Sequence, residues 1–267
     1  MGEEEILPMV CADGNEYPEL CVVENIESGR VKRLRVALKV APQIVNSRDK
    51  FFSTTPLMIA ANSIQLDAAK CLIEMGALLD LRDKGGFNAM VWAARKGSVE
   101  LIKYFLDMYD EYHDGKFPDV GSKHGCGWAL CQPGASAANG ALLAASVYGH
   151  IPIVKYLLYK RNADINCTDG RKITPLLLAS YKGRHELVEF MVNETDADVH
   201  FKCGEGKDCL DWAKKKSWSK VVAVLEQDVR RRKIEKTVER DLESVIMLKD
   251  CIIGACGFSS HKYNISS

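Results

Sequence analysis

Short clusters of apolar residues recur along the chain at a helical spacing, and the clusters themselves repeat. Residues 55–60 are Thr-Pro-Leu-Met-Ile-Ala, and residues 174–179 are Thr-Pro-Leu-Leu-Leu-Ala. Weaker copies occupy residues 88–93, 140–145 and 208–213. The third positions of the five copies are 57, 90, 142, 176 and 210, so the spacings are 33, 52, 34 and 34 residues. This period predicts a stack of similar units, with 19 residues inserted where the spacing is 52.

Each unit has the features of two helices joined by a turn. Thr55 and Thr174 precede the first helix, where a hydroxyl can accept a backbone N–H, and a proline follows each of them. A glycine such as Gly97 ends that helix, because a left-handed residue is favoured there. After a second apolar cluster, residues 163–170 have the composition of an extended loop with a tight turn.

The period of 33 to 34 residues and the Thr-Pro-Leu-x-x-Ala core resemble the ankyrin repeat family, over roughly residues 18–226. The resemblance implies an all-α fold: an ankyrin-repeat solenoid of helix-turn-helix units with finger loops, stabilised by stacking. About six repeats fit, and several are divergent. None keeps the histidine of the family motif, and Ile64-Gln65 stands where a Gly-His pair is expected.

Other segments flank or interrupt this array. Residues 1–17 are an acidic tail, and a loop insertion rich in Gly, Asp, His and Pro lies near 109–137. Residues 227–250 are a basic amphipathic helix followed by a tail at 251–267. Apolar residues from 224 to 246, mostly four or five apart, predict one continuous helix over about 218–250. We expect this helix to cover the open end of the solenoid.

Composition excludes several classes of protein. The 267 residues are 47% apolar and 27% charged, which is ordinary for a globular chain. Lys+Arg and Asp+Glu both total 36, so the whole molecule is not a polybasic nucleic-acid binder. No apolar run is long enough to cross a membrane, and the acidic start is not typical of a signal peptide. We therefore expect a cytoplasmic protein, with the nucleus as a second location, in which most of the ten cysteines are reduced.

Catalytic motifs are not found in the sequence. There is no Walker loop, no HExxH, no GxSxG and no strand followed by GxGxxG. The six histidines are dispersed, and no serine or cysteine has the sequence context of a nucleophile. The prediction is a protein that is not an enzyme and needs no cofactor.

The insertion carries the best candidate metal site. Four nitrogen or sulfur ligands suit tetrahedral zinc, and this segment offers His113, His124, Cys126 and Cys131. Their spacing matches no common zinc finger, and no CxxC pair is present. The sequence therefore favours a loop with incidental histidines and cysteines, and a zinc-dependent site is the alternative.

A basic run spans Lys214 to Arg240, with ten bases and four acids. The clusters at 214–216 and 230–233 resemble a bipartite nuclear-import signal, but a folded helix hides the extended form that an import receptor binds. We therefore favour the interpretation that these bases lie on a helix face that is exposed to solvent. Nucleic-acid binding is not predicted, because only Trp218 is interleaved with these bases.

One asparagine matches a modification pattern. Leu158, five residues and then Asp164-Ile165-Asn166 resemble the ankyrin sequence that a dioxygenase hydroxylates on asparagine. The favoured alternative is structural, because the Asn166 amide can itself stabilise the turn.

The repeats themselves carry the main functional signal. In the ankyrin family, the residues just after the motif alanine lie on the concave face beside the fingers. Here those slots hold Asn62, Ser63, Arg95, Lys96, Val147, Tyr148, Tyr181 and Lys182. Rings and cations of this kind are typical of binding hot spots. A partner segment that carries acids and at least one large apolar residue would complement them.

Two functional hypotheses follow. The favoured one is a non-catalytic adaptor or scaffold that binds a partner protein through the concave face and fingers. The alternative is a regulatory or substrate-receptor subunit of an enzyme complex such as a ubiquitin ligase. Residues 247–251 give Leu-x-x-Cys where the receptor box of such subunits has Leu-x-x-x-Cys, so the adaptor is preferred.

Overall fold

The computed structural model describes residues 18–113 and 136–255, and within them the chain is helical with no strand. The helices in chain order are α1 Pro18–Glu27, α2 Val31–Val40, the 3-10 turn η1 Pro42–Asn46, α3 Pro56–Asn62, α4 Leu66–Glu74, α5 Ala89–Lys96, α6 Val99–His113, α7 Ala137–Tyr148, α8 Ile151–Arg161, α9 Pro175–Tyr181, α10 His185–Glu194, α11 Cys209–Lys215 and α12 Ser219–Ala255. The predicted all-α class is confirmed.

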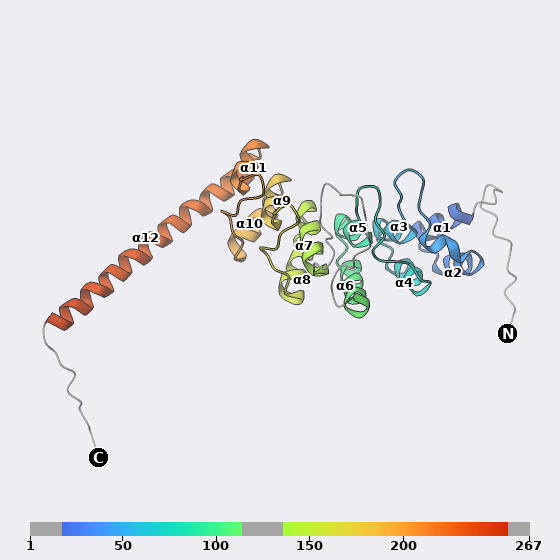
Figure 1. Cartoon of the computed structure of the whole chain (residues 1–267), viewed down its shortest axis with the longest axis horizontal. Helices are drawn as coiled ribbons and strands as arrows, with labels where there is room; N and C mark the ends of the chain where they lie inside the picture. The colour runs from blue at the N-terminus through green and yellow to red at the C-terminus, as the bar shows by residue number, and fades with distance from the viewer. Residues whose placement is uncertain (1–17, 114–135, 256–267) are drawn as a thin grey trace, which may run out of the picture.

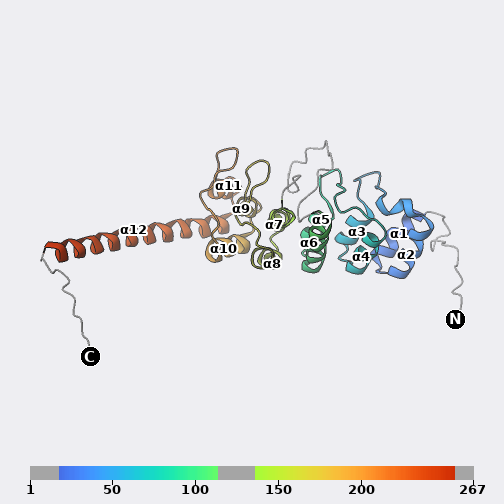
Figure 2. The same cartoon turned by 60° about the horizontal axis from the view of Figure 1, so that its bottom comes forward.

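Over the described residues these helices form six antiparallel pairs stacked side by side (Figure 1). The first helices of the pairs, α1, α3, α5, α7, α9 and α11, make an inner row in which each contacts the next. The second helices make an outer row, and the finger loops project from the inner row away from it (Figure 2). The period of 33 to 34 residues therefore corresponds to one helix pair and one finger.

The predicted helix starts are confirmed at the two full motif copies. The Thr55 and Thr174 hydroxyls accept the N–H groups of Met58 and Leu177 at 3.4 and 3.3 Å. Pro56 and Pro175 occupy the first helical turn, where no N–H is needed.

The ends of the inner helices follow the same logic. Gly97, Gly149 and Gly183 have φ angles of 80°, 85° and 72°, in the left-handed region. Ile64 and Ser217 occupy the equivalent positions with φ angles of 56° and 58°. The divergent repeats thus keep the backbone turn although they lack the glycine.

Neighbouring repeats are joined by a regular ladder of side chains. At four of the left-handed positions, the residue that follows points back to the preceding repeat. A nitrogen of its side chain lies within hydrogen-bond distance of a backbone carbonyl in that preceding repeat. The carbonyl belongs to the residue two positions before the left-handed residue of the preceding repeat. The pairs are Gln65 with Glu27 at 3.2 Å, His150 with Arg95 at 3.0 Å, Arg184 with Val147 at 3.1 Å and Trp218 with Tyr181 at 3.0 Å.

The insertion begins later than the sequence suggested. Residues 109–113 are the last turn of α6, and Tyr109 is completely buried. Its hydroxyl donates to the Asp80 carboxylate at 2.7 Å and accepts from the Asn88 amide at 3.1 Å. This buried polar contact extends α6 by more than a turn, and the described chain resumes at residue 136.

The C-terminal helix differs most from expectation. Val221 and Leu225 are buried, and this first part of α12 packs on α10 and α11 as the second helix of the last repeat. Every described residue beyond Arg232 is exposed, and α12 runs out from the array in both views (Figures 1 and 2). The helix expected over about 218–250 therefore covers the end of the solenoid through its first turns alone, because the described residues from Lys233 to Met247 are all exposed.

Candidate functional site

Most of the predicted binding residues lie where the inner helices end. Asn62 and Ser63 are half-buried at the end of α3, while Arg95 and Lys96 are exposed at the end of α5. Tyr148 ends α7 and is half-buried. Equivalent positions of successive repeats thus place these side chains on one surface.

Tyr181 and Lys182, at the end of α9, are half-buried as well, but Val147 does not belong to this surface. Only 7% of Val147 is exposed, and it packs in the hydrophobic core. The prediction of Val147 as a partner-binding residue is corrected, because its side chain points between the helices.

The densest part of this surface is built around two aromatic rings. Tyr181 of α9 meets Trp212 of α11 edge to face, with ring centroids 5.2 Å apart. Four ammonium groups surround the two rings. Lys207 and Lys215 lie 4.8 and 4.7 Å from the Trp212 ring, and Lys216 and Lys182 lie 4.8 and 5.5 Å from the Tyr181 ring. These six residues are called the Trp212 cluster below.

The Trp212 cluster combines the two kinds of group that bind acidic protein segments. Cation–π contacts hold the lysines against the rings, which limits the rotamer freedom that a bound partner would otherwise remove. Several like charges held within one small area favour an incoming anion. Glu205 neutralises part of this charge through a 3.0 Å contact with Lys207.

A second aromatic centre lies on α5. The Arg95 guanidinium lies 5.0 Å from the Trp92 ring, and the indole N–H of Trp92 donates to Asp83 at 3.0 Å. Asp83 belongs to the finger that precedes α5, so this bond holds the finger against the inner helix. Trp92 and Trp212 occupy the same motif position in their repeats.

Tyr148 lies between these two centres along the array. Burial raises the pKa of the Tyr148 hydroxyl, while the nearby cations Arg95 and Arg184 lower it and Asp83 raises it. The ring is therefore partly covered and close to charges of both signs. Because the Tyr148 side chain is half-buried, removing its ring would also cost packing.

Three of the described finger turns are each organised by one aspartate side chain. Asp49 accepts from the N–H groups of Phe51, Phe52 and Thr54 at 2.7, 3.0 and 2.8 Å. Asp83 accepts from the N–H of Phe87, and Asp169 accepts from the N–H groups of Arg171 and Ile173. These bonds close the finger turns, which project beside the inner row of helices (Figure 2).

In the last finger Cys203 occupies the position of these aspartates. Burial acts to raise the pKa of its thiol, but hydrogen bonds from Trp212 and from the backbone N–H groups of Glu205 and Lys207 outweigh it and lower the pKa. Burial raises the pKa of Cys167 and Cys209 to about 12. Cys71, Cys167, Cys203 and Cys209 are free and buried as expected, whereas Cys21 takes part in a disulfide.

Sequence reasoning missed Trp92, Trp212 and Lys207. A signal for the tryptophans was present, since Arg95 and Lys215 each follow a tryptophan by three residues, which places the pair on one helix face. Lys207 approaches Trp212 from the finger, and only the folded turn brings them together.

The zinc candidates cannot be assembled from the described residues. Nε2 of His113 lies 3.4 Å from the Asp80 carboxylate, so this histidine has a partner at the end of α6. His124, Cys126 and Cys131 lie outside the described residues. Within the described ranges no group of three or more potential ligands is gathered as a metal site.

Asn166 joins two neighbouring fingers. Its amide nitrogen donates to the carbonyl of Asp196 at 3.0 Å, and its amide oxygen accepts from the N–H of Asp198 at 2.9 Å. Asn46 makes the same pair of bonds to Gly76 and Leu78 in an earlier repeat. The favoured structural role agrees with these contacts, and hydroxylation of Asn166 stays a prediction.

The family model described as ankyrin repeats (3 copies) matches residues 22–115 and 141–233, which is well over half of the chain. The chain therefore belongs to the ankyrin repeat family. Ankyrin repeats form protein–protein interaction domains, and proteins of this family are typically not enzymes. Within the described ranges no helix is both long and apolar enough to cross a membrane.

Its relatives include much longer proteins. The chain is 29% identical over 223 residues to the ankyrin repeat and KH domain-containing protein CBG24701 of Caenorhabditis briggsae, covering 73% of this chain and 7% of that protein. It is 29% identical over 183 residues to the ankyrin repeat and KH domain-containing protein mask-1 of Caenorhabditis elegans, covering 60% and 6%. The chain thus spans less than a tenth of the length of these relatives.

Solved structures agree on the fold. The crystal structure of the ankyrin repeat protein EF0377 matches with a TM-score of 0.53 at 24% identity, covering 79% of this chain and 98% of that one. A chain from the complex of the predatory endopeptidase Bd0816 of Bdellovibrio bacteriovorus with immunity protein Bd3460 matches with a TM-score of 0.54 at 20% identity, covering 78% and 97%. At these identities the likeness shows the shared fold alone.

Proposed function

We propose that the chain is a non-catalytic adaptor that binds a partner protein through the inner-helix ends and fingers of its last two repeats. The observation that carries this proposal is the Trp212 cluster, in which four lysines surround two packed aromatic rings. The preferred partner segment carries acidic side chains next to a large apolar one. The acids would meet the ammonium groups, and the apolar side chain would cover the partly exposed rings.

The remaining surface supports the same mode of binding. Arg95 and Lys96 extend the positive charge toward the middle of the array, and Trp92 offers a second partly exposed ring. An extended segment lying along the inner-helix ends could therefore contact both aromatic centres. We propose that such a partner is met in the cytoplasm.

A random-peptide display selection tests this proposal without a known partner. The wild-type chain should enrich peptides that contain several Asp or Glu residues beside Leu, Phe or Trp. Binding of the enriched peptides should weaken as salt is raised, because exposed charges are screened. Enrichment of neutral or basic peptides would contradict the proposed partner chemistry.

Charge-reversal variants locate the surface. Lys215→Glu with Lys216→Glu should weaken the binding of enriched peptides by about 2 kcal/mol or more, as for hot-spot residues. The matched control is Lys160→Glu with Lys220→Glu, since both lysines are exposed outside the Trp212 cluster and the charge change is the same. Equal losses in both variants would mean that net charge, and not the cluster, determines binding.

A further inference from the structure

The first finger carries two large apolar side chains that face water. Phe51 and Phe52 lie between η1 and α3, and they are 79% and 70% exposed. Single exposed apolar side chains are common on protein surfaces, but neighbouring ones on a projecting loop mark a contact surface. The pair therefore indicates that the tip of this finger meets an apolar partner.

The N–H groups around these rings are satisfied within the chain. Residues 51, 52 and 54 donate to the Asp49 carboxylate at 2.7, 3.0 and 2.8 Å, and Ser53 donates to the Asp49 carbonyl at 3.0 Å. The Phe52 carbonyl accepts from the N–H of Lys84 in the next finger at 2.9 Å. Because an unpaired N–H is costly to remove from water, a tip with satisfied donors enters an apolar medium at a lower cost.

Exposed bases flank the two rings. Lys50 and Lys84 belong to the first two fingers, and the Lys84 ammonium donates to the Lys50 carbonyl at 3.1 Å. Arg48 is exposed as well, and its guanidinium donates to the Arg82 carbonyl at 3.1 Å. These bonds hold the two fingers together and keep three exposed cations beside the rings.

Positive charge continues along the other described fingers, which project from the same side of the array (Figure 2). The four described finger turns, residues 49–54, 83–87, 169–173 and 203–207, are called the finger edge below. Its five bases are Lys50, Lys84, Arg171, Lys172 and Lys207.

The acids of the finger edge do not cancel this outward charge. Asp49, Asp83 and Asp169 accept N–H groups of their own turns, and the latter two are buried. Glu205 lies 3.0 Å from the Lys207 ammonium and is neutralised by it. The finger edge therefore presents cations, with two aromatic rings at one end.

An anionic lipid bilayer matches the finger edge in shape and in chemistry. A bilayer surface is broad and flat, so the projecting turns of several fingers can meet it together. Its anionic headgroups attract bases, and the boundary below the headgroups receives aromatic rings. An added protein strand fits less well, because every N–H of residues 51–54 already has an acceptor.

We propose that the finger edge binds the surface of an anionic lipid bilayer, with Phe51 and Phe52 inserted into the boundary between headgroups and acyl chains. Two rings and a few bases give reversible binding. The rings lie at the other end of the array from the Trp212 cluster (Figure 1). The chain can therefore hold a partner segment while its first finger contacts a membrane.

Sedimentation of the full chain with lipid vesicles tests the proposal. The chain should bind vesicles of phosphatidylcholine that contain about one third phosphatidylserine, and it should bind pure phosphatidylcholine vesicles at least about tenfold more weakly. Binding to the anionic vesicles should fall as salt is raised, because the attraction of the bases to the surface is screened.

Removal of the rings tests their part in binding. Phe51→Ala with Phe52→Ala should weaken binding to the anionic vesicles by about tenfold or more. The matched control is Tyr112→Ala with Tyr159→Ala, which removes two rings that are 60% and 58% exposed on the outer helices α6 and α8. This control should bind as wild type does, and thermal melts should show that both variants keep the folded array.

Charge reversal tests the bases in the same assay. Lys50→Glu with Lys84→Glu should lower binding to the anionic vesicles to about the level of pure phosphatidylcholine. Lys160→Glu with Lys220→Glu makes the same change of charge at exposed positions outside the finger edge, and it should bind as wild type does.

A fluorescence measurement tests insertion itself. Phe52→Trp should add emission that lipids with brominated acyl chains quench, whereas Tyr159→Trp should add emission that they do not quench. The phenylalanine double variant should still bind the acidic peptides from the display selection, because the Trp212 cluster is unchanged. Failure of membrane binding is thus distinguishable from failure of the proposed partner binding.

Three outcomes would overturn the proposal. The first is a wild-type chain that does not prefer anionic vesicles, including one that is retained by single-stranded polyuridine instead. The second is equal loss of vesicle binding in a variant and its matched control. The third is Phe52→Trp emission that brominated acyl chains leave unchanged.

Discussion

At the scale of single residues, four of the described finger turns each depend on one acceptor side chain. Asp49, Asp83 and Asp169 each accept backbone N–H groups from the turn that follows them. Cys203 holds the same position in the last finger and lies beside Trp212 in the Trp212 cluster. The turn is thus conserved in geometry while its acceptor changes from a carboxylate to a sulfur.

We predict that Asp49→Asn destabilises the chain in a pH-dependent way. Hydrogen bonds from the Thr54 hydroxyl, Phe52 and other turn donors hold the pKa of Asp49 well below its usual range. Because the folded-state pKa is lowered, the contribution to stability is present above the unfolded pKa of about 3.9 and is lost as the pH falls toward the folded value.

Urea unfolding of wild type and Asp49→Asn between pH 8 and pH 3 measures this effect. The difference in unfolding free energy should be constant down to about pH 5 and should narrow below about pH 4. The reverse trend, a difference that grows on acidification, would show that the Asp49 carboxylate does not organise the turn.

At the scale of helices, the repeats are coupled by the ladder of Gln65, His150, Arg184 and Trp218. These four different side chains perform the same function, since each covers a left-handed residue and reaches a carbonyl of the preceding repeat. At Gly183 the fit leaves no room for a side chain, because an added Cβ would lie 2.6 Å from the Trp218 ring. Stacking therefore depends on glycine at that position for two separate reasons.

Gly183→Ala and Gly76→Ala separate those two reasons. Both residues have a positive φ, but a Cβ on Gly76 meets nothing within 4 Å. Gly76→Ala should cost about 1–2 kcal/mol from the left-handed backbone alone. Gly183→Ala should cost a further 1–3 kcal/mol or so from steric overlap with the Trp218 ring.

A double-mutant cycle with Trp218→Ala checks the origin of the extra cost. Gly183→Ala should be less harmful in the Trp218→Ala background, and chemical denaturation gives the four free energies. If the cost of Gly183→Ala is the same in both backgrounds, the ring is not the source of the strain.

At the scale of the whole molecule, the chain has one folded array and one projecting helix. Within the described residues each repeat contacts its neighbours, and the last repeat is completed by residues 219–232 of α12. The segment beyond has no buried side chain among its described residues. The stability of the array should therefore depend on the first part of α12 and not on the projecting part.

Truncation at two points of α12 tests this separation. Removing residues 233–267 should change Tm by less than about 2 °C, since only exposed residues of the described helix are lost. Removing residues 219–267 should lower stability and expose the core of the last repeat, because Val221 and Leu225 are then missing. Equal Tm values for both truncations would show that residues 219–232 do not complete the last repeat.

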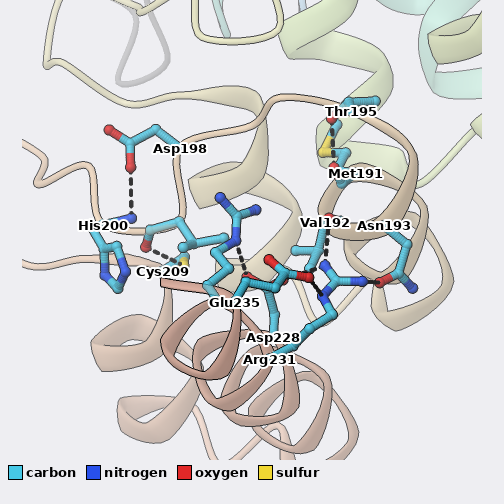
Figure 3. Close-up of polar contacts among 12 residues, drawn as sticks. Met191, Val192, Asn193, Thr195, Asp198, His200, Cys209, Asp228, Arg231 and Glu235 are labelled. Atoms are coloured by element: carbon cyan, nitrogen blue, oxygen red, sulfur yellow. Dashed lines mark hydrogen bonds and ion pairs between the residues drawn. The ribbon is translucent and has the colours of Figure 1, made fainter. Parts of the chain in front are cut away.

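Asp228→Ala tests, in the full chain, the ion pairs that Asp228 makes with Arg231 and Arg232 in the first part of α12. The variant should lower the unfolding free energy by about 1–3 kcal/mol, because Arg231 and Arg232 lose their buried acceptor. No loss in this variant would mean that the contact between Asp228 and Arg231, shown in Figure 3, adds nothing to the stability of the last repeat.

The sequence by itself determined the repeat, the class of fold and the ends of the inner helices. Thr55, Pro56 and Gly97 act through local backbone geometry, so their positions predict helix starts and stops without tertiary information. For the same reason, the sequence could locate the surface that carries Arg95, Lys96 and Tyr181, which recur at fixed positions after the motif alanine.

Only the tertiary structure decided which of those side chains face outward and what they contact. Val147 is buried although its neighbours in the pattern are not, because packing between adjacent helices depends on the whole stack. Lys207 joins Trp212 through the folded finger, and α12 projects because the array ends before the helix does. Local patterns determine where helices begin and end, whereas contacts between residues distant in sequence arise only after the chain has folded.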